Sequence, residues 1–76
     1  MEISNFIENL KDVFEEANPE LIIPVCRYKE LDGWSSLIAL SVIAMVDEEY
    51  DVELKGDDIR NSETIGDLFN IVQSRK

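Results

Sequence analysis

The chain has 76 residues, the length of one small domain and too short for a two-domain enzyme. Its 17 Asp and Glu residues outnumber 7 Lys and Arg residues, and the net charge of -10 disfavours nucleic acid and favours proteins with basic surfaces. There is no histidine, so the commonest general base and zinc ligand is missing. We therefore expect residues 1–76 to form one non-catalytic acidic domain without a metal site.

The first predicted helix covers residues 4–17. Apolar residues recur there at steps of three and four, the period of a helix face that packs on a core. Asn18-Pro19 ends the helix, because the residue before proline is pushed out of the helical region. Residues 18–34 show no clean period, and Pro24 interrupts both a strand and a helix. We expect a long loop whose apolar side chains fold onto the core.

The second predicted helix covers residues 36–50 and follows a turn at Asp32-Gly33. Serine before an apolar run is typical of a helix N-cap, whose hydroxyl accepts a hydrogen bond from an otherwise unpaired amide. Leu37, Leu40 and Ala44 lie largely to one side of the core face, and part of this apolar surface is expected to stay exposed for a partner. The predicted core face comprises Ala39, Val42, Ile43, Val46 and Tyr50.

Two further helices are predicted in the last third of the chain. A short one begins near Gly56 and ends at about Arg60. Thr64, followed three residues later by Asp67, resembles a capping box, and apolar residues continue at helical spacing to about Ser74. The predicted fold is therefore an all-α bundle of four helices, three of them long and the third one short.

Several features bear on where the protein acts. The longest nearly apolar stretch, residues 37–46, is about half the length of a membrane span. The acidic first residues lack the basic-then-apolar order of a signal peptide. The single cysteine, Cys26, allows no internal disulfide, and we interpret it as a small core or loop residue. We expect a cytoplasmic monomer without a membrane span.

Residues 30–54, ELDGWSSLIALSVIAMVDEEYDVEL, resemble the attachment motif of acyl carrier and peptidyl carrier proteins. In that family a Leu–Gly-type turn leads to Asp-Ser-Leu and then to a helix that ends in an acidic run and an aromatic residue. Tyr28 lies where the family usually has Phe, and residues 52–54, 57–58 and 64–65 match its later elements in order. The resemblance covers nearly the whole chain and implies the acyl carrier fold.

The resemblance implies that Ser36 carries 4′-phosphopantetheine, a flexible covalent arm whose terminal thiol holds an acyl group as a thioester. A phosphodiester at the first turn of a helix meets free backbone amides and the positive end of the helix dipole. Leu37 follows the modified serine as in the family, which selects Ser36 and leaves Ser35 as the N-cap. The family usually has Asp where this chain has Ser35, and we expect Asp32 to supply a carboxylate from the turn.

The implied partners are a phosphopantetheinyl transferase and acyl-transferring and condensing enzymes with basic surfaces, in fatty-acid, polyketide or related lipid biosynthesis. Acidic residues are frequent at positions 47–58. The first of them lie at the C-terminal end of the predicted helix, where negative charge opposes the helix dipole. Weak electrostatic docking of partner enzymes explains this run better than fold stability does. The predicted partner-binding residues are Leu37, Leu40, Ser41, Ala44, Asp47, Glu48 and Asp57.

Alternatives remain open for function and for two structural features. The chain would otherwise be a carrier of aminoacyl or peptidyl groups, although its acid content favours acyl cargo, or a non-catalytic adaptor whose acidic face binds a basic protein or imitates DNA. Trp34 is expected to close the turn as a half-buried ring, and a second interpretation is that it also shields the base of the arm. A set of apolar residues is expected either to pack as ordinary core or to open around an acyl chain, namely Val42, Ile43, Val46, Leu68 and Phe69.

Overall fold

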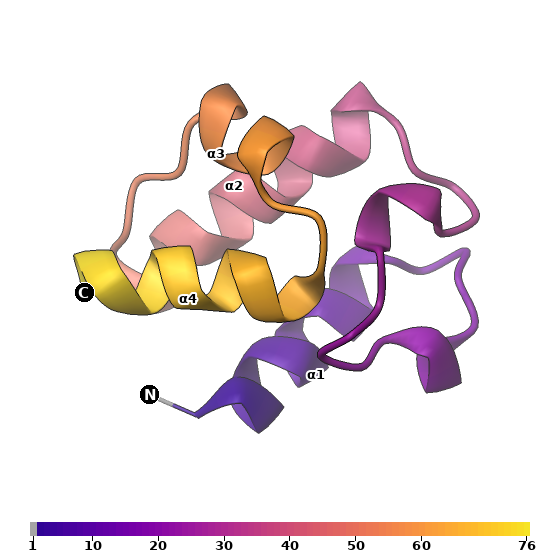
Figure 1. The fold of residues 1–76 in the computed structure, drawn as a ribbon. Helices are drawn as coiled ribbons and strands as arrows, with labels where there is room; N and C mark the ends of the chain where they lie inside the picture. Colours follow the sequence, from indigo (N-terminus) through magenta and orange to yellow (C-terminus); the bar gives the residue numbers. More distant parts are fainter. Residues whose placement is uncertain (1) are drawn as a thin grey trace.

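The computed structural model describes residues 2–76, which form an all-helical domain without strands. The α-helices are α1 (Ile3–Val13), α2 (Ser36–Tyr50), α3 (Gly56–Asn61) and α4 (Ile65–Arg75), as Figure 1 shows. Two 3₁₀ turns, η1 (Pro19–Leu21) and η2 (Tyr28–Glu30), lie between α1 and α2. The predicted all-α class, with three long helices and a short third one, is confirmed for this part of the chain.

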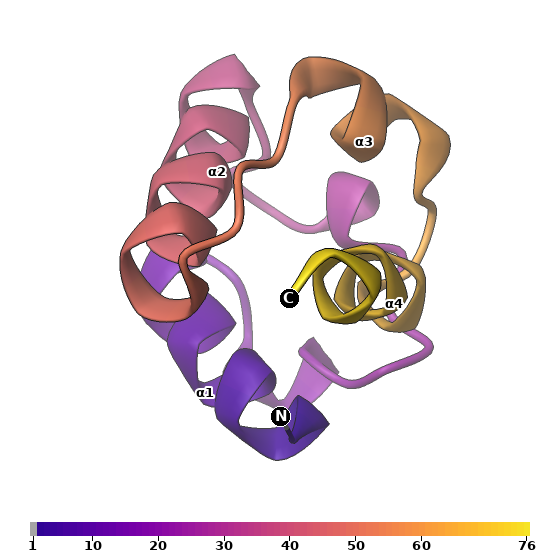
Figure 2. The ribbon, with the colours of Figure 1, turned by 90° about the vertical axis from the view of Figure 1, so that its left-hand side faces the viewer.

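The helices enclose one core. α1 packs against α2 and α4, whereas α3 packs against α4. Figure 2 looks almost along α4 and shows α1 and α2 on one side of the molecule, with α3 and α4 on the other. Phe6 of α1 lies at the centre, with the rings of Tyr50 and Phe69 tilted against it at centroid distances of 5.9 and 5.5 Å. These aromatic pairs join three helices that are distant in sequence.

Helix α1 is shorter than the sequence predicts. The prediction of residues 4–17 is wrong at its end, because Phe14 has non-helical dihedral angles (φ -91°, ψ 61°). The amide of Phe14 still donates to the carbonyl of Leu10 at 2.8 Å, and the chain then turns. Phe14 stacks on the Trp34 ring, with 6.1 Å between the centroids. The turn replaces the last predicted part of the helix and keeps Phe14 and Ala17 buried.

The segment between α1 and α2 covers the core only in part. Ile22, Tyr28 and Leu31 are buried as predicted. The expectation is wrong for three other apolar side chains, which are 54%, 46% and 74% exposed: Leu21, Ile23 and Val25.

Backbone hydrogen bonds explain why residues 23–25 do not turn inward. The amides of Ile65 and Gly66, at the start of α4, donate to the carbonyls of Cys26 and Pro24 at 3.0 and 2.9 Å. The first amides of a helix have no acceptor within the helix itself. The carbonyls of Pro24 and Cys26 therefore face α4, and the side chains of Ile23 and Val25 lie in solvent.

The ends of α2, α3 and α4 follow the sequence closely. α2 has the predicted bounds, although Ala39 and Ile43 on its predicted core face are only half-buried. The capping box of α4 is confirmed: the Thr64 hydroxyl accepts from the Asp67 amide, and the Asp67 carboxylate accepts from the Thr64 amide, both at 3.1 Å. No helix in residues 2–76 combines the length and apolar character needed to cross a membrane.

Candidate functional site

Ser36 is the first residue of α2, and its side chain is exposed. The preceding residue, Ser35, is extended and is the N-cap, as predicted: its hydroxyl accepts from the Ile38 amide at 3.3 Å. The carbonyl of Ser35 accepts from the amide of Ala39 at 3.0 Å. Ser35 is therefore committed to the helix, whereas the Ser36 hydroxyl forms no hydrogen bond within residues 2–76.

Two backbone amides at the start of α2 donate no hydrogen bond within the described part of the chain. They belong to Ser36 and Leu37, the first two residues of α2. Free amides at a helix N-terminus, together with the positive end of the helix dipole, favour an anionic group nearby. The local geometry therefore suits a phosphate ester on the Ser36 oxygen.

The turn before Ser36 is fixed by Gly33 and Trp34. Gly33 has a φ of 85°, in the left-handed region that favours glycine, and a Cβ there would lie 2.5 Å from Oε2 of Glu16. Trp34 is half-buried as predicted, and its ring meets that of Tyr28 edge-on, with 5.5 Å between the centroids. The ring anchors the turn to the core and so fixes where α2 begins.

The exposed side of α2 near Ser36 is apolar. Leu37 and Leu40 are 71% and 62% exposed, and Ala44 is also exposed, so three of the predicted partner-binding residues lie at the surface. Ser41, another of these predicted residues, is half-buried, and its hydroxyl donates to the Leu37 carbonyl at 3.1 Å. The helix backbone takes up that hydrogen bond, so the surface beside Ser36 is chiefly two leucines and an alanine.

The predicted docking acids fall into two environments. Asp47 and Glu48 are exposed in the last turns of α2, and none of the ion pairs within residues 2–76 includes them. Asp57 lies on α3 and is paired with Arg60 one turn later. Asp57 is therefore already paired within α3, unlike Asp47 and Glu48.

A cavity that the sequence did not predict lies between the end of α1 and the turn before α2. Its volume is ≈190 Å³, and its wall is partly apolar and partly acidic. It joins two stretches, residues 13–16 and 32–38, that no local pattern brings together. The lining residues are Val13, Phe14, Glu15, Glu16, Asp32, Gly33 and Ile38. Asp32, expected to supply a carboxylate from the turn, lies at this cavity.

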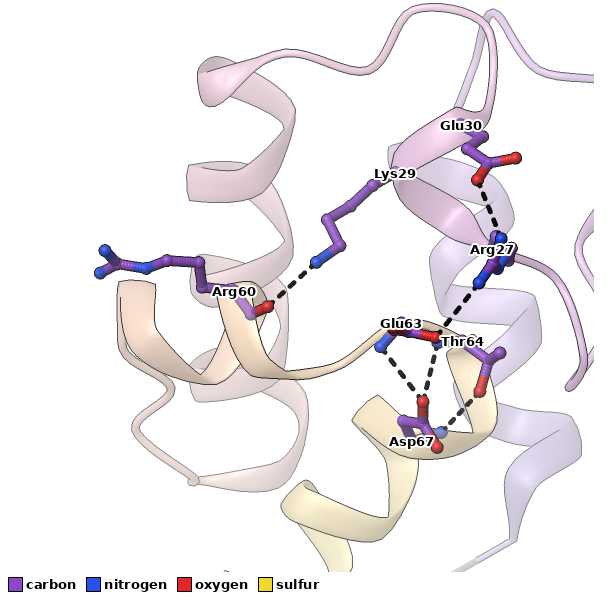
Figure 3. Close-up of polar contacts among 7 residues, drawn as sticks. All are labelled: Arg27, Lys29, Glu30, Arg60, Glu63, Thr64 and Asp67. Carbon is purple, nitrogen blue, oxygen red and sulfur yellow. Dashed lines mark hydrogen bonds and ion pairs between the residues drawn. The ribbon is translucent and has the colours of Figure 1, made fainter.

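A polar cluster ties η2 and Arg27 before it to the end of α3 and to the segment that follows α3, as Figure 3 shows. Arg27 pairs with Glu30 at 3.6 Å and with Glu63 at 3.3 Å. Lys29 Nζ donates to the carbonyls of Ile59 and Arg60 at 2.9 and 3.3 Å. Arg27 and Lys29 line a second cavity of ≈230 Å³, but both are already engaged by acceptors of the protein. This cluster is therefore structural.

The remaining candidates offer no reactive group. Cys26 is half-buried, and burial raises the pKa of its thiol, which disfavours the reactive thiolate. Burial likewise raises the pKa of Tyr28, whose hydroxyl hydrogen-bonds to Ser62 and to the Ile59 carbonyl. Within residues 2–76 no three His, Cys, Asp or Glu side chains are placed to hold a metal ion.

The predicted acyl-sheltering set packs together as core. Val42, Val46, Leu68 and Phe69 are buried, and Ile43 is half-buried against them. The alternative in which these side chains part around a cargo stays a prediction.

Comparison with known proteins adds no assignment. No protein-family model matches the chain, and no solved structure matches it at a significant level. The functional interpretation therefore depends on the geometry around Ser36 and on the distribution of charge.

Proposed function

We propose that this protein is an acyl carrier protein, in which Ser36 carries a covalent 4′-phosphopantetheine arm. The observation that supports it most is the pairing of roles at the start of α2. Ser35 caps the helix, which leaves Ser36 exposed and next to two unpaired amides. A serine that only capped the helix would account for Ser35 and not for Ser36.

The residues present fit the chemical group. The Ser36 and Leu37 amides would face the phosphate of the arm, and their partial positive charge favours it. When bound, the arm supplies a thiol that holds an acyl group as a thioester. In the attachment step the bond between Ser36 Oγ and phosphorus forms while the pyrophosphate bond of coenzyme A breaks. The nucleotide half of coenzyme A leaves as adenosine 3′,5′-bisphosphate, and the transferase accepts the hydroxyl proton. No base from this chain is required.

The surface around Ser36 supports weak docking of several enzymes. Leu37 and Leu40 offer exposed apolar area beside the attachment point, and Asp47 and Glu48 carry free negative charge farther along the same helix. Exposed charges act over ~8–10 Å at physiological salt and raise encounter rates more than they raise affinity. A carrier that must leave each enzyme after use benefits from this combination.

Intact-mass measurement tests the proposal. Incubation with coenzyme A, Mg²⁺ and a phosphopantetheinyl transferase is expected to add one arm to the wild-type chain and to Ser35→Ala, and none to Ser36→Ala. Circular dichroism of both variants checks that they keep their helices. An unmodified wild-type protein after incubation with several transferases contradicts the proposal.

The unpaired acids of α2 also support a second candidate, a non-catalytic adaptor that binds a basic protein. An adaptor requires no modification, so its binding is expected to survive Ser36→Ala unchanged. Cargo is decided separately: offering the modified protein to acyl-loading and aminoacyl-loading enzymes distinguishes an acyl carrier from an aminoacyl or peptidyl carrier.

A further inference from the structure

Helix α3 depends on its neighbours for stability. It has six residues, Gly56–Asn61, and isolated helices shorter than about 12–15 residues are marginal in water. Ile59 is its one buried residue, and the preceding segment from 51 to 55 is not helical. Short elements with few buried apolar contacts open at lower free energy than the core does. The polar contacts at its two ends therefore have a large share in holding α3.

The C-terminal end of α3 is held by Lys29 at the surface and by Tyr28 in the core. Lys29 Nζ donates to the carbonyls of Ile59 and Arg60, as Figure 3 shows for Arg60, and the Tyr28 hydroxyl donates to the Ile59 carbonyl at 3.2 Å. Tyr28 is fully buried. A visiting protein cannot replace the Tyr28 hydrogen bond without opening the core.

The N-terminal end of α3 is held by a clasp at the surface, formed by Asp58 and Arg75. Two parallel hydrogen bonds join them: Nη1 to Oδ2 at 2.5 Å and Nη2 to Oδ1 at 2.6 Å. Arg75 Nη1 also donates to the Glu53 carbonyl at 3.3 Å, and Asp58 accepts from the Lys55 amide at 2.9 Å. The hydrogen bonds from Arg75 are the main reason that the pKa of Asp58 is lowered.

The two partners of the clasp differ in accessibility. The Asp58 side chain is 14% exposed and the Arg75 side chain is 42% exposed. A guanidinium arriving from solvent therefore meets Arg75 first and competes with it for the same carboxylate. Exchanging one bidentate guanidinium for another leaves no buried charge unpaired, so the exchange has no large desolvation cost.

We propose that the Asp58–Arg75 clasp is a release point for α3, opened when an arginine of a docked partner takes the place of Arg75 on Asp58. The partner's arginine does not belong to α4, so α3 loses its tie to that helix. The first turn of α3 then moves away from the core together with the segment before it. Three apolar side chains that are now buried become exposed, namely Val52, Leu54 and Ile59. The identity of the partner, an enzyme with a basic surface, rests on the proposed function; the clasp itself does not.

The neighbouring Asp57–Arg60 pair provides a matched control. Both of its members lie on α3 and are largely exposed, at 78% and 75% of their side-chain surface. Breaking this pair removes an arginine–aspartate contact of the same helix without untying α3 from α4. The two pairs therefore separate loss of an ion pair from loss of the clasp.

Amide hydrogen exchange of the unmodified protein, followed by NMR, tests the clasp. Arg75→Gln is expected to speed exchange of the Asp58, Ile59 and Ser62 amides by about fivefold, while Val42 and Val46 in α2 change far less. Arg60→Gln is expected to leave all of these rates nearly unchanged. Equal acceleration in α3 and α2, or none in α3, overturns the role of the clasp.

A pair of peptides tests release by arginine. A short arginine-containing peptide is expected to speed exchange of the same α3 amides in the wild-type protein by about threefold, and to add nothing in Arg75→Gln. The matched peptide with neutral citrulline is expected to have no effect. An arginine peptide that slows exchange, leaves it unchanged, or acts no differently from citrulline overturns the proposal. Since Ser36 is unmodified throughout, this result is independent of the intact-mass experiment.

Discussion

Two groups of acidic residues in this protein have opposite relations to the fold. The α2 acids, Asp47 and Glu48, lie near the C-terminal end of their helix, exposed and outside every ion pair of residues 2–76. The capping acids, Asp58 and Asp67, lie in the first turns of α3 and α4 and accept hydrogen bonds from backbone amides. A carboxylate stabilises the positive end of a helix and opposes the negative end. The capping acids therefore stabilise the fold, whereas the α2 acids are free for binding without any change in the fold.

The largest expected effect on the free energy of unfolding comes from replacing a capping acid. Asp58→Ala removes the acceptor of the Lys55 amide and the partner of Arg75, and is expected to lower the free energy of unfolding by about 1–2 kcal/mol in urea denaturation. Asp57→Ala, one residue earlier and exposed, is the control and is expected to change it by less than ~0.5 kcal/mol. Equal effects of the two substitutions would contradict the distinction between capping and surface carboxylates.

A smaller effect is expected from the pH dependence of Asp67. The amides of Thr64 and Glu63 lower the pKa of this carboxyl below its ordinary value. The ionised form is thus favoured in the folded state, so its contribution is complete well above the unfolded pKa of ~3.9 and is lost as the pH falls through the lowered folded value.

The difference in unfolding free energy between wild type and Asp67→Asn measures this contribution. We expect it to be constant from about pH 5 to pH 7 and to shrink progressively below about pH 4. Urea titrations at several pH values provide the measurement. A difference that grows in acid would mean that Asp67 is not held in its ionised form.

The smallest effect on stability is expected from the α2 acids. Asp47→Asn combined with Glu48→Gln is expected to leave the free energy of unfolding unchanged or to raise it by up to ~1 kcal/mol, because it removes charge that opposes the helix dipole. The same variant is expected to slow modification by the transferase several-fold at low salt, and less at high salt. Asp12→Asn combined with Glu20→Gln controls for net charge, because both acids are exposed, lie outside α2 and do not line the cavity before it. Equal slowing by both variants would mean that only total charge matters.

The fold and the start of α2 were accessible from local patterns. Ser35 before an apolar run predicts a helix start, and Thr64 with Asp67 predicts another, because both signals act between residues three apart. The end of α1 was not accessible in this way. Its position depends on the contact between Phe14 and Trp34, which are 20 residues apart in sequence.

Local sequence patterns predict some features of the candidate site and not others. Exposure of Leu37 and Leu40 follows from a helix with more apolar residues than one core face holds. The cavity between residues 13–16 and 32–38 and the pairing of Asp58 with Arg75 give no sequence signal, because each depends on how separate elements pack. Asp57 and Asp58 are adjacent and chemically identical, yet one pairs within its own helix and the other with α4.

The amino-acid sequence by itself determined the helical class, the bounds of α2, the helix caps and the placement of Ser36 at a helix N-terminus, since these depend on neighbours within one or two helical turns. Tertiary structure alone decided where α1 ends, which apolar loop residues stay in solvent, and which acid is paired with a residue of another helix. Those outcomes depend on the packing of helices against one another, and a carboxylate is free or occupied according to which cation the fold brings beside it.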